Sequence, residues 1–295
     1  MSRERPERGL RSPAGELPVH IHWTRLAADR AAIAACVLAA AIVVLPLALL
    51  VIHLLARGVP ALSPAFFTHM PKPVGEPGGG MANAIVGTLI VVGIGAAIAV
   101  PVGVAAGLHL AEFGRDRLAT IVRYTADVLA GAPSIVVGVA VFGLLVVPMG
   151  RFSALAGGVA LAVLMLPTVV RSTEEVVRLV PNSYRQAALA LGAPRWIATL
   201  RVVLPAARAG VTTAALLAVA RASGETAPLL FTALGNRFWS VRADQPIATL
   251  PVMIFDYARA PYPDWNAQAW TGALVLLVLV TLLSALMRVA TRRIS

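Results

Sequence analysis

Six stretches of this 295-residue chain are long enough, or nearly long enough, and apolar enough to cross a membrane as helices. Spanning the hydrocarbon core takes about 20 mostly apolar residues in a helix. The six stretches are residues 31–55, 84–110, 128–147, 155–170, 210–234 and 271–286. Hydrophobic residues make up 58% of the chain and charged residues 13%, against roughly 45–50% and 25% in soluble domains. The sequence therefore predicts an all-α membrane protein with six transmembrane helices.

The basic residues are distributed unevenly between the segments that join these stretches. If the N-terminus is cytoplasmic, 18 of the 25 basic residues fall in cytoplasmic segments and six in outer ones. Basic residues concentrate on the cytoplasmic side of membrane proteins. We therefore expect both termini in the cytoplasm. The net charge of +11 is then an orientation signal, with membrane lipid as the surrounding partner and no nucleic acid.

Several kinds of chemistry are excluded by residue counts. Lys72, the only lysine, lies between two prolines, so no P-loop lysine is present to bind a nucleotide phosphate. Cys36 is the only cysteine, and the five histidines form no i, i+4 pair, which argues against a zinc site. We expect no catalytic residue, metal or cofactor in this chain. Any ATP that drives it is held, with its magnesium, by another subunit.

The order of these segments suggests three parts. Residues 1–30 mix Arg, Glu, Pro and Gly without apolar periodicity, which is typical of a cytoplasmic tail. Residues 31–55 form the first transmembrane helix, and residues 83–287 form the main membrane domain. Within that domain, Gly103 and Gly107 make a G-x-x-x-G pair, a pattern that allows close packing of membrane helices.

The segment 179–208, between the fourth and fifth spans, has the pattern of two short cytoplasmic helices. Ser183 and Gln186 form a possible capping box, and Gly192 follows an Ala-rich run where a helix would end. A second helix is expected from Pro194 to about Leu204, ending at Pro205. An Ala-rich helix outside the lipid suits insertion into a groove of a partner. Packing on its own bundle is the alternative.

Charged residues inside the predicted spans are the best candidates for a functional site. A charge near a span centre costs about 2.5–3.5 kcal/mol, so it faces the bundle interior or a wet cavity. Arg221 and Glu225 are spaced i, i+4 in the fifth stretch and are expected to share one helix face, on which they can pair. Arg171 and Glu174 lie at the cytoplasmic mouth of the fourth. These charges either line a substrate path or form structural salt bridges.

Two motifs resemble those of the permeases of binding-protein-dependent ABC importers. The residues Gln186, Ala187, Ala188, Gly192 and Pro205 resemble the EAA loop of these permeases, with Gln186 where the family usually has Glu. The run ARASGETAPLL at residues 220–230 is similar to the signature of phosphate-transport permeases of the PstA type. Residues 83–88, 133–138 and 268–270 agree with that family.

The resemblance implies a type I ABC importer permease (MetI-like) fold in residues 83–287, with an EAA-like coupling loop at 179–208. It also implies a bacterial plasma membrane location and three kinds of protein partner. These are a homologous permease subunit of the PstC type, two ATPase subunits of the PstB type and an external phosphate-binding protein of the PstS type.

Read in this way, Arg221, Glu225, Arg171 and Glu174 are expected to line a path for inorganic phosphate. The planar guanidinium of an arginine donates to two phosphate oxygens at once. An ABC permease for another oxyanion is one alternative. An ion-coupled secondary transporter is the other, and it would need paired acidic residues deep in the membrane, where only Glu225 lies near a span centre.

Overall fold

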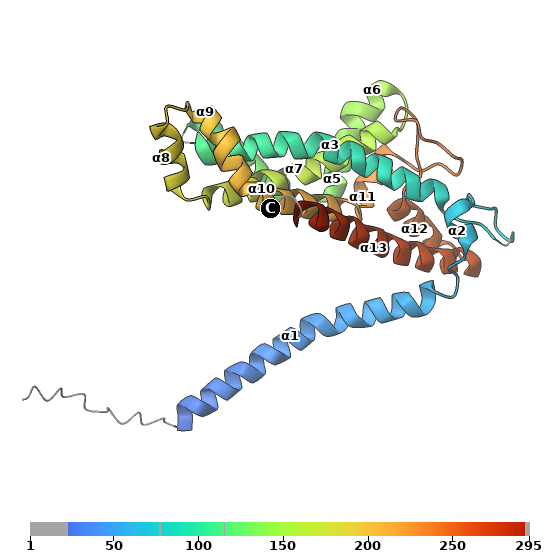
Figure 1. The fold of residues 1–295 in the computed structure, drawn as a ribbon. Coiled ribbons are helices and arrows are strands. Elements are labelled where there is room, and N and C mark those ends of the chain that lie inside the picture. The colour runs from blue at the N-terminus through green and yellow to red at the C-terminus, as the bar shows by residue number, and fades with distance from the viewer. Residues whose placement is uncertain (1–22, 77, 115, 293–295) are drawn as a thin grey trace, which may run out of the picture. The chain divides into compact units, whose positions relative to one another are not determined.

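The computed structural model describes residues 23–76, 78–114 and 116–292, and this part of the chain is almost entirely helical (Figure 1). Five helices are long and apolar enough to cross a membrane, and a sharply bent helix pair adds a sixth span. The prediction of an all-α six-span bundle is therefore confirmed. The helices in chain order are α1 (Trp23–Gly58), α2 (Pro64–Thr68), α3 (Ala82–Glu112), α4 (Arg117–Gly131), α5 (Ser134–Val141), α6 (Val147–Met149), α7 (Ala154–Arg178), α8 (Asn182–Ala190), α9 (Arg195–Ala198), α10 (Leu204–Ala222), α11 (Ala227–Thr232), α12 (Leu250–Arg259) and α13 (Pro263–Arg292).

The chain divides into two compact units, one ending at Ile52 and one beginning at His53. The first consists, in its described part, of most of α1, which begins at Trp23, before the predicted boundary at residue 31. Its residues 33–50 are almost all apolar, as suits a helix that crosses a membrane. Residues 1–22 of the predicted tail lie outside the described residues.

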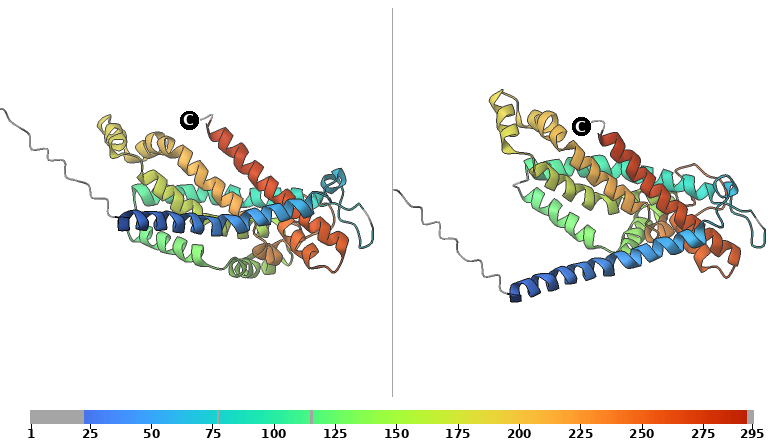
Figure 2. Two further views of the ribbon diagram at one scale, coloured as in Figure 1. Left: turned by 90° about the horizontal axis from the view of Figure 1, so that it is seen from below. Right: turned by 60° about the horizontal axis from the view of Figure 1, so that its bottom comes forward.

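The core of the second unit is the contact between α3 and α7, which run side by side through it (Figures 1 and 2). Gly103 and Gly107 bring the two backbones together. A Cβ on Gly103 would lie 2.7 Å from Val169 Cγ1, and one on Gly107 would lie 2.7 Å from the carbonyl oxygen of Val170. Small residues drive close packing where lipid supplies no hydrophobic force between helices. The expected role of this glycine pair is confirmed.

The third span is bent where the sequence predicted a straight helix over residues 128–147. Helices α4 and α5 meet at an angle of 108° around Ala132 and Pro133. Proline disfavours the helical conformation of the residue before it, and Ala132 is extended, with φ −71° and ψ 133°. After α5, a π-helical turn (η1, Phe142–Val146) leads into α6. The break leaves a space between the α4–α5 junction and α7.

The fifth span also differs from its predicted range of 210–234. It runs from Arg195 to Ala222, through α9, a π-helical turn (η2, Thr199–Val203) and α10. The prediction that a helix ends at Pro205 is therefore wrong. Proline removes one backbone hydrogen bond and clashes with the preceding turn of an α-helix, and a π-helical turn just before it relieves that clash. Pro205 lies in the first turn of α10.

The two ends of the second unit differ in composition. At one end, α8 projects beyond the spans and α9 begins the fifth span, whereas α2 and α12 lie at the opposite end (Figures 1 and 2). The α12 end has its own apolar cluster, in which Phe66, Met81 and Leu250 are fully buried. The α8 end holds most of the ion pairs of the described residues.

Candidate functional site

The break between α4 and α5 opens onto a cavity of about 270 Å³ in the membrane bundle. Its wall comes from the α4–α5 junction, from α7 and from the end of α10. Arg221 and Glu225 both line it, together with Pro133, Ser134 and Thr168. Arg221 is exposed and Glu225 half-buried where they line this cavity, so neither charge is enclosed among apolar side chains.

The expected pairing of Arg221 and Glu225 on one helix face is wrong. Helix α10 ends at Ala222, and Glu225 lies in the short connection to α11. The Ser223 hydroxyl donates to the carbonyl oxygen of Val219, and Gly224 follows, a residue with weak helix propensity. Among the ion pairs of the described residues, none includes Arg221 or Glu225. Neither charge is therefore paired with another charged side chain of the described residues.

Arg171 and Glu174 belong to a cluster of charges between α4 and α7. Glu174 is buried, with its side chain 3% exposed. Its carboxylate accepts hydrogen bonds from the guanidinium groups of Arg123 at 2.8 Å and Arg178 at 2.6 Å. Arg171 lies 3.5 Å from the same carboxylate. A buried carboxylate is stabilised only where such partners compensate for the loss of water. Glu174 therefore holds three arginines together at the end of the α7 helix.

Arg171 also makes a two-pronged contact with Asp127 of α4, through Nε at 2.9 Å and through Nη2. Both side chains are partly exposed, Arg171 by 33% and Asp127 by 58%. They lie about one helical turn from the cavity, because Thr168 on α7 and Ala130 on α4 line its wall. The α4–α7 contact thus carries a chain of charges that begins next to the cavity.

The 179–208 segment folds as two short helices around a tight turn. Gly192 has φ +81°, and it closes α8 with two hydrogen bonds: Gly192 N to Leu189 O, 3.0 Å, and Ala193 N to Ala188 O, 3.1 Å. This is the Schellman arrangement, which glycine favours because it has no Cβ. The predicted end of the helix at Gly192 is confirmed.

The predicted capping box at Ser183 and Gln186 is wrong. Helix α8 begins two residues earlier than an N-cap at Ser183 would give, at Asn182, with Pro181 as its N-cap and no capping hydrogen bond from a side chain. Gln186 and Ala187 are exposed on α8, and Ala188 is buried. The exposed face also includes Leu191. An exposed apolar face on a short helix outside the spans suits contact with another protein.

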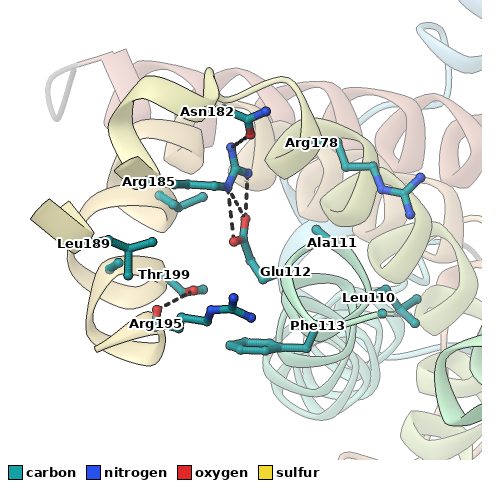
Figure 3. A pocket seen from close by; sticks show the side chains of 13 residues that line it. Leu110, Ala111, Glu112, Phe113, Arg178, Asn182, Arg185, Leu189, Arg195 and Thr199 are labelled. Atoms are coloured by element: carbon teal, nitrogen blue, oxygen red, sulfur yellow. Dashed lines mark hydrogen bonds and ion pairs between the residues drawn. The ribbon is translucent and has the colours of Figure 1, made fainter. Parts of the chain in front are cut away.

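A second cavity, of about 670 Å³, lies between this segment and the end of α3 (Figure 3). Arg178, Arg185 and Arg195 line it together with Glu112 and Asn182. The side chain of Arg185 points from α8 toward Glu112, and its Nη2 lies 2.6 Å from a Glu112 oxygen (Figure 3). Glu112 was not among the residues selected from the sequence. No spacing rule connects it with Arg185, which is 73 positions away.

The helical spans, one of them bent, together with a cavity lined by charged residues define the chain as a multi-pass membrane protein. Comparison with known families then identifies it more closely. Residues 99–295 match the family described as binding-protein-dependent transport system inner membrane component, and the chain belongs to this family.

Similar proteins include the phosphate transport system permease protein PstA of Yersinia pestis, 45% identical over 79% of each chain. Another is PstA 1 of Mycobacterium tuberculosis, 38% identical over 85% of each chain. Among solved structures, a chain of the inward-facing MetNI methionine ABC transporter has a TM-score of 0.62 and 20% identity, covering 73% of this chain and 96% of that one. This likeness confirms the expected type I permease fold.

Proposed function

We infer that this chain is the permease subunit of an ATP-driven importer of inorganic phosphate. The observation that supports it most directly is the run of relatives named as phosphate transport permeases, which match about four fifths of the chain at 38–45% identity. The chain is a transport subunit and not an enzyme. As a member of a binding-protein-dependent family, it works with an ATPase and with a substrate-binding protein.

We propose that phosphate passes through the cavity at the break in the third span. Phosphate is an anion near neutral pH, and Arg221 offers it a guanidinium with no ion-pair partner among the described residues. Glu225 lines the same cavity and can hold Arg221 by rotation of either side chain when phosphate is absent. Arg171 supplies the next cation, one helical turn from the cavity wall, and Asp127 and Glu174 hold Arg171 in place.

The 179–208 segment is proposed as the surface that docks to the ATPase. Gln186, Ala187, Ala188, Gly192 and Pro205 match the EAA-like motif, and the first two are exposed on α8. Gln186 keeps polar contact with a partner but carries no charge. The ATPase subunits, two of the PstB type, hold ATP and magnesium. Their nucleotide-driven motion would displace α8 and tilt the spans, which exposes the cavity to one side of the membrane at a time.

The remaining partners follow from the same family. A second, PstC-type permease would complete the path on the open side of the cavity, and a PstS-type binding protein would deliver phosphate at the α12 end. This places α8 and both termini in the cytoplasm of a bacterium, in agreement with the arginine distribution.

Replacement of Arg221 tests the proposed path. Arg221→Gln is expected to lower labelled-phosphate uptake at least about tenfold, because a charge-assisted contact contributes about 1.5–3 kcal/mol. The complete complex would be purified alongside, and the ATPase subunits are expected to remain bound. Arg117→Gln removes an exposed arginine outside the cavity and serves as the matched control, with uptake unchanged.

Loss of assembly in the Arg221→Gln complex would instead assign Arg221 to a structural ion pair with the second permease. A further outcome is that sulfate or molybdate competes for uptake of labelled phosphate as strongly as unlabelled phosphate does. That result would assign the importer to another oxyanion.

A further inference from the structure

Helix α8 packs beside α9 and η2 at the start of the fifth span, and its link to α3 and α7 is made mainly by one side chain, that of Arg185. Most of its residues are exposed, and Ala188 is the one that is buried. Its other inward-facing residue is Arg185, whose side chain is 19% exposed. Leu189 and Leu191 leave large parts of their surfaces uncovered. Apolar packing therefore contributes little to holding α8 against α3 and α7.

Arg185 compensates for this with hydrogen bonds to three separate parts of the chain. Its Nε and Nη2 atoms donate to both carboxylate oxygens of Glu112, the last residue of α3, at 2.6–3.2 Å. Nη2 also donates to the carbonyl oxygen of Val177 at 3.0 Å, and Nη1 to that of Val180 at 2.5 Å. These two carbonyls belong to the end of α7 and the turn that follows it.

The carboxylate at the centre of this arrangement is well shielded, since the side chain of Glu112 is only 12% exposed. A bidentate arginine–carboxylate contact in such surroundings is directional, because the planar fork fixes the relative orientation of the two groups. Arg185 thus ties α8 to α3 and α7 together. These are the two helices whose glycine-lined contact forms the core of the bundle.

We propose that Arg185 is the positioning residue that transmits displacement of α8 to the transmembrane helices, through Glu112 of α3 and the carbonyl groups at the end of α7. The proposal rests on the proposed function, in which an ATPase moves the 179–208 segment. A helix held by apolar contact alone can slide over its neighbour, whereas a helix held by a bidentate ion pair and two further hydrogen bonds moves with it.

The experiment uses the complete importer, reconstituted in vesicles with its binding protein, and measures phosphate transported per ATP hydrolysed. Glu112→Gln keeps the size of the side chain and removes its charge. We expect the transport ratio to fall about fivefold or more, with the ATPase subunits still bound in full amount. Arg185→Lys keeps the charge but cannot reach Glu112 and both carbonyls together, so an intermediate ratio is expected. Arg117→Gln, an exposed arginine at the same end of the bundle, is the control.

A purely structural role for the ion pair would lower the amount of complex without changing the ratio in the complex that remains. An unchanged ratio in fully assembled Glu112→Gln complex would overturn the proposal. If the unaltered complex hydrolysed ATP without moving phosphate, the proposed function would fail first, and that outcome is separate from the other two.

Discussion

Gly192 joins α8 to α9 in a left-handed backbone conformation, with φ +81°. A Cβ at this position would meet no atom within 4 Å, so space does not limit the choice of residue. The limit is conformational, because an L-residue in the left-handed helical region costs about 1–2 kcal/mol and a β-branched side chain is especially unsuited to it. Gly192 therefore determines where α8 ends and how the segment turns back.

Gly192→Val is accordingly expected to lower phosphate transported per ATP in reconstituted complex, because the strained turn misplaces α8 against the ATPase. Asparagine tolerates the left-handed region, so Gly192→Asn adds a side chain of similar bulk without this strain and is expected to stay near the unaltered ratio. Equal losses in the two variants would show that bulk at the docking surface, and not backbone conformation, is responsible.

Single residues also mark the limits of what the sequence could predict. The turn at Gly192 was predictable, since glycine after an Ala-rich run is a local signal. The capping box at Ser183 was not confirmed, because Pro181 already provides an N-cap and the helix begins at Asn182. The choice between partners for Glu174 depends on α4 lying beside α7, which no local pattern indicates.

At the level of elements, the contact between α3 and α7 depends on the absence of side-chain atoms. A Cβ at Gly107 would lie 2.6 Å from Thr173 Cβ and 2.7 Å from a backbone oxygen of Val170. Neither atom is the end of a flexible side chain, so the helices must separate to admit a methyl group. Gly93 lies on the same helix, and a Cβ there would meet nothing within 4 Å.

Gly107→Ala is therefore expected to destabilise the bundle by about 1–3 kcal/mol, the usual cost of overpacking. Gly93→Ala is expected to cause no loss, since it adds a better helix former in open space. Thermal unfolding of the purified chain in detergent, followed by helical circular dichroism, measures both. Equal shifts in the two variants would show that loss of glycine as such, and not the α3–α7 contact, determines stability.

Element boundaries were harder to predict than element types, for a physical reason that Pro205 illustrates. In isolation, proline ends or kinks a helix. Here a π-helical turn at Thr199–Val203 precedes it and carries the helix through to Ala222. Conversely, the chain at Pro133 turns by 108° within a stretch of continuous apolar residues. Hydropathy reports how long an apolar stretch is, and it contains no information on its direction.

At the level of the whole molecule, the six-span arrangement was predictable because membrane helices must satisfy their own backbone hydrogen bonds, which links hydropathy directly to structure. The site was predictable in part. The sequence identified Arg221 and Glu225, which the fold places around one cavity. It did not identify Glu112 or its contact with Arg185, since a pair of charges at the ends of two helices becomes visible only once the helices are packed.

The orientation of the bundle is a further property of the whole molecule, and it follows from where the arginines lie. Arg117 is exposed at the α8 end, and Phe238, 75% exposed, lies in the connection between α11 and α12 at the opposite end. Helix α3, with 31 residues, separates these ends by about 45 Å. A reagent that cannot cross the membrane therefore reaches one position from each side.

The labelling experiment begins from a chain in which Cys36, the only cysteine, is replaced by serine. Arg117→Cys is expected to react with an impermeant thiol reagent only in inverted membrane vesicles, because basic residues concentrate in the cytoplasm. Phe238→Cys is expected to react only in vesicles of the native orientation. The cysteine-free chain is expected to react in neither kind of vesicle. The reverse pattern would place α8 outside the cell, where no ATPase could dock to it, and the proposed coupling through Arg185 would fail with it.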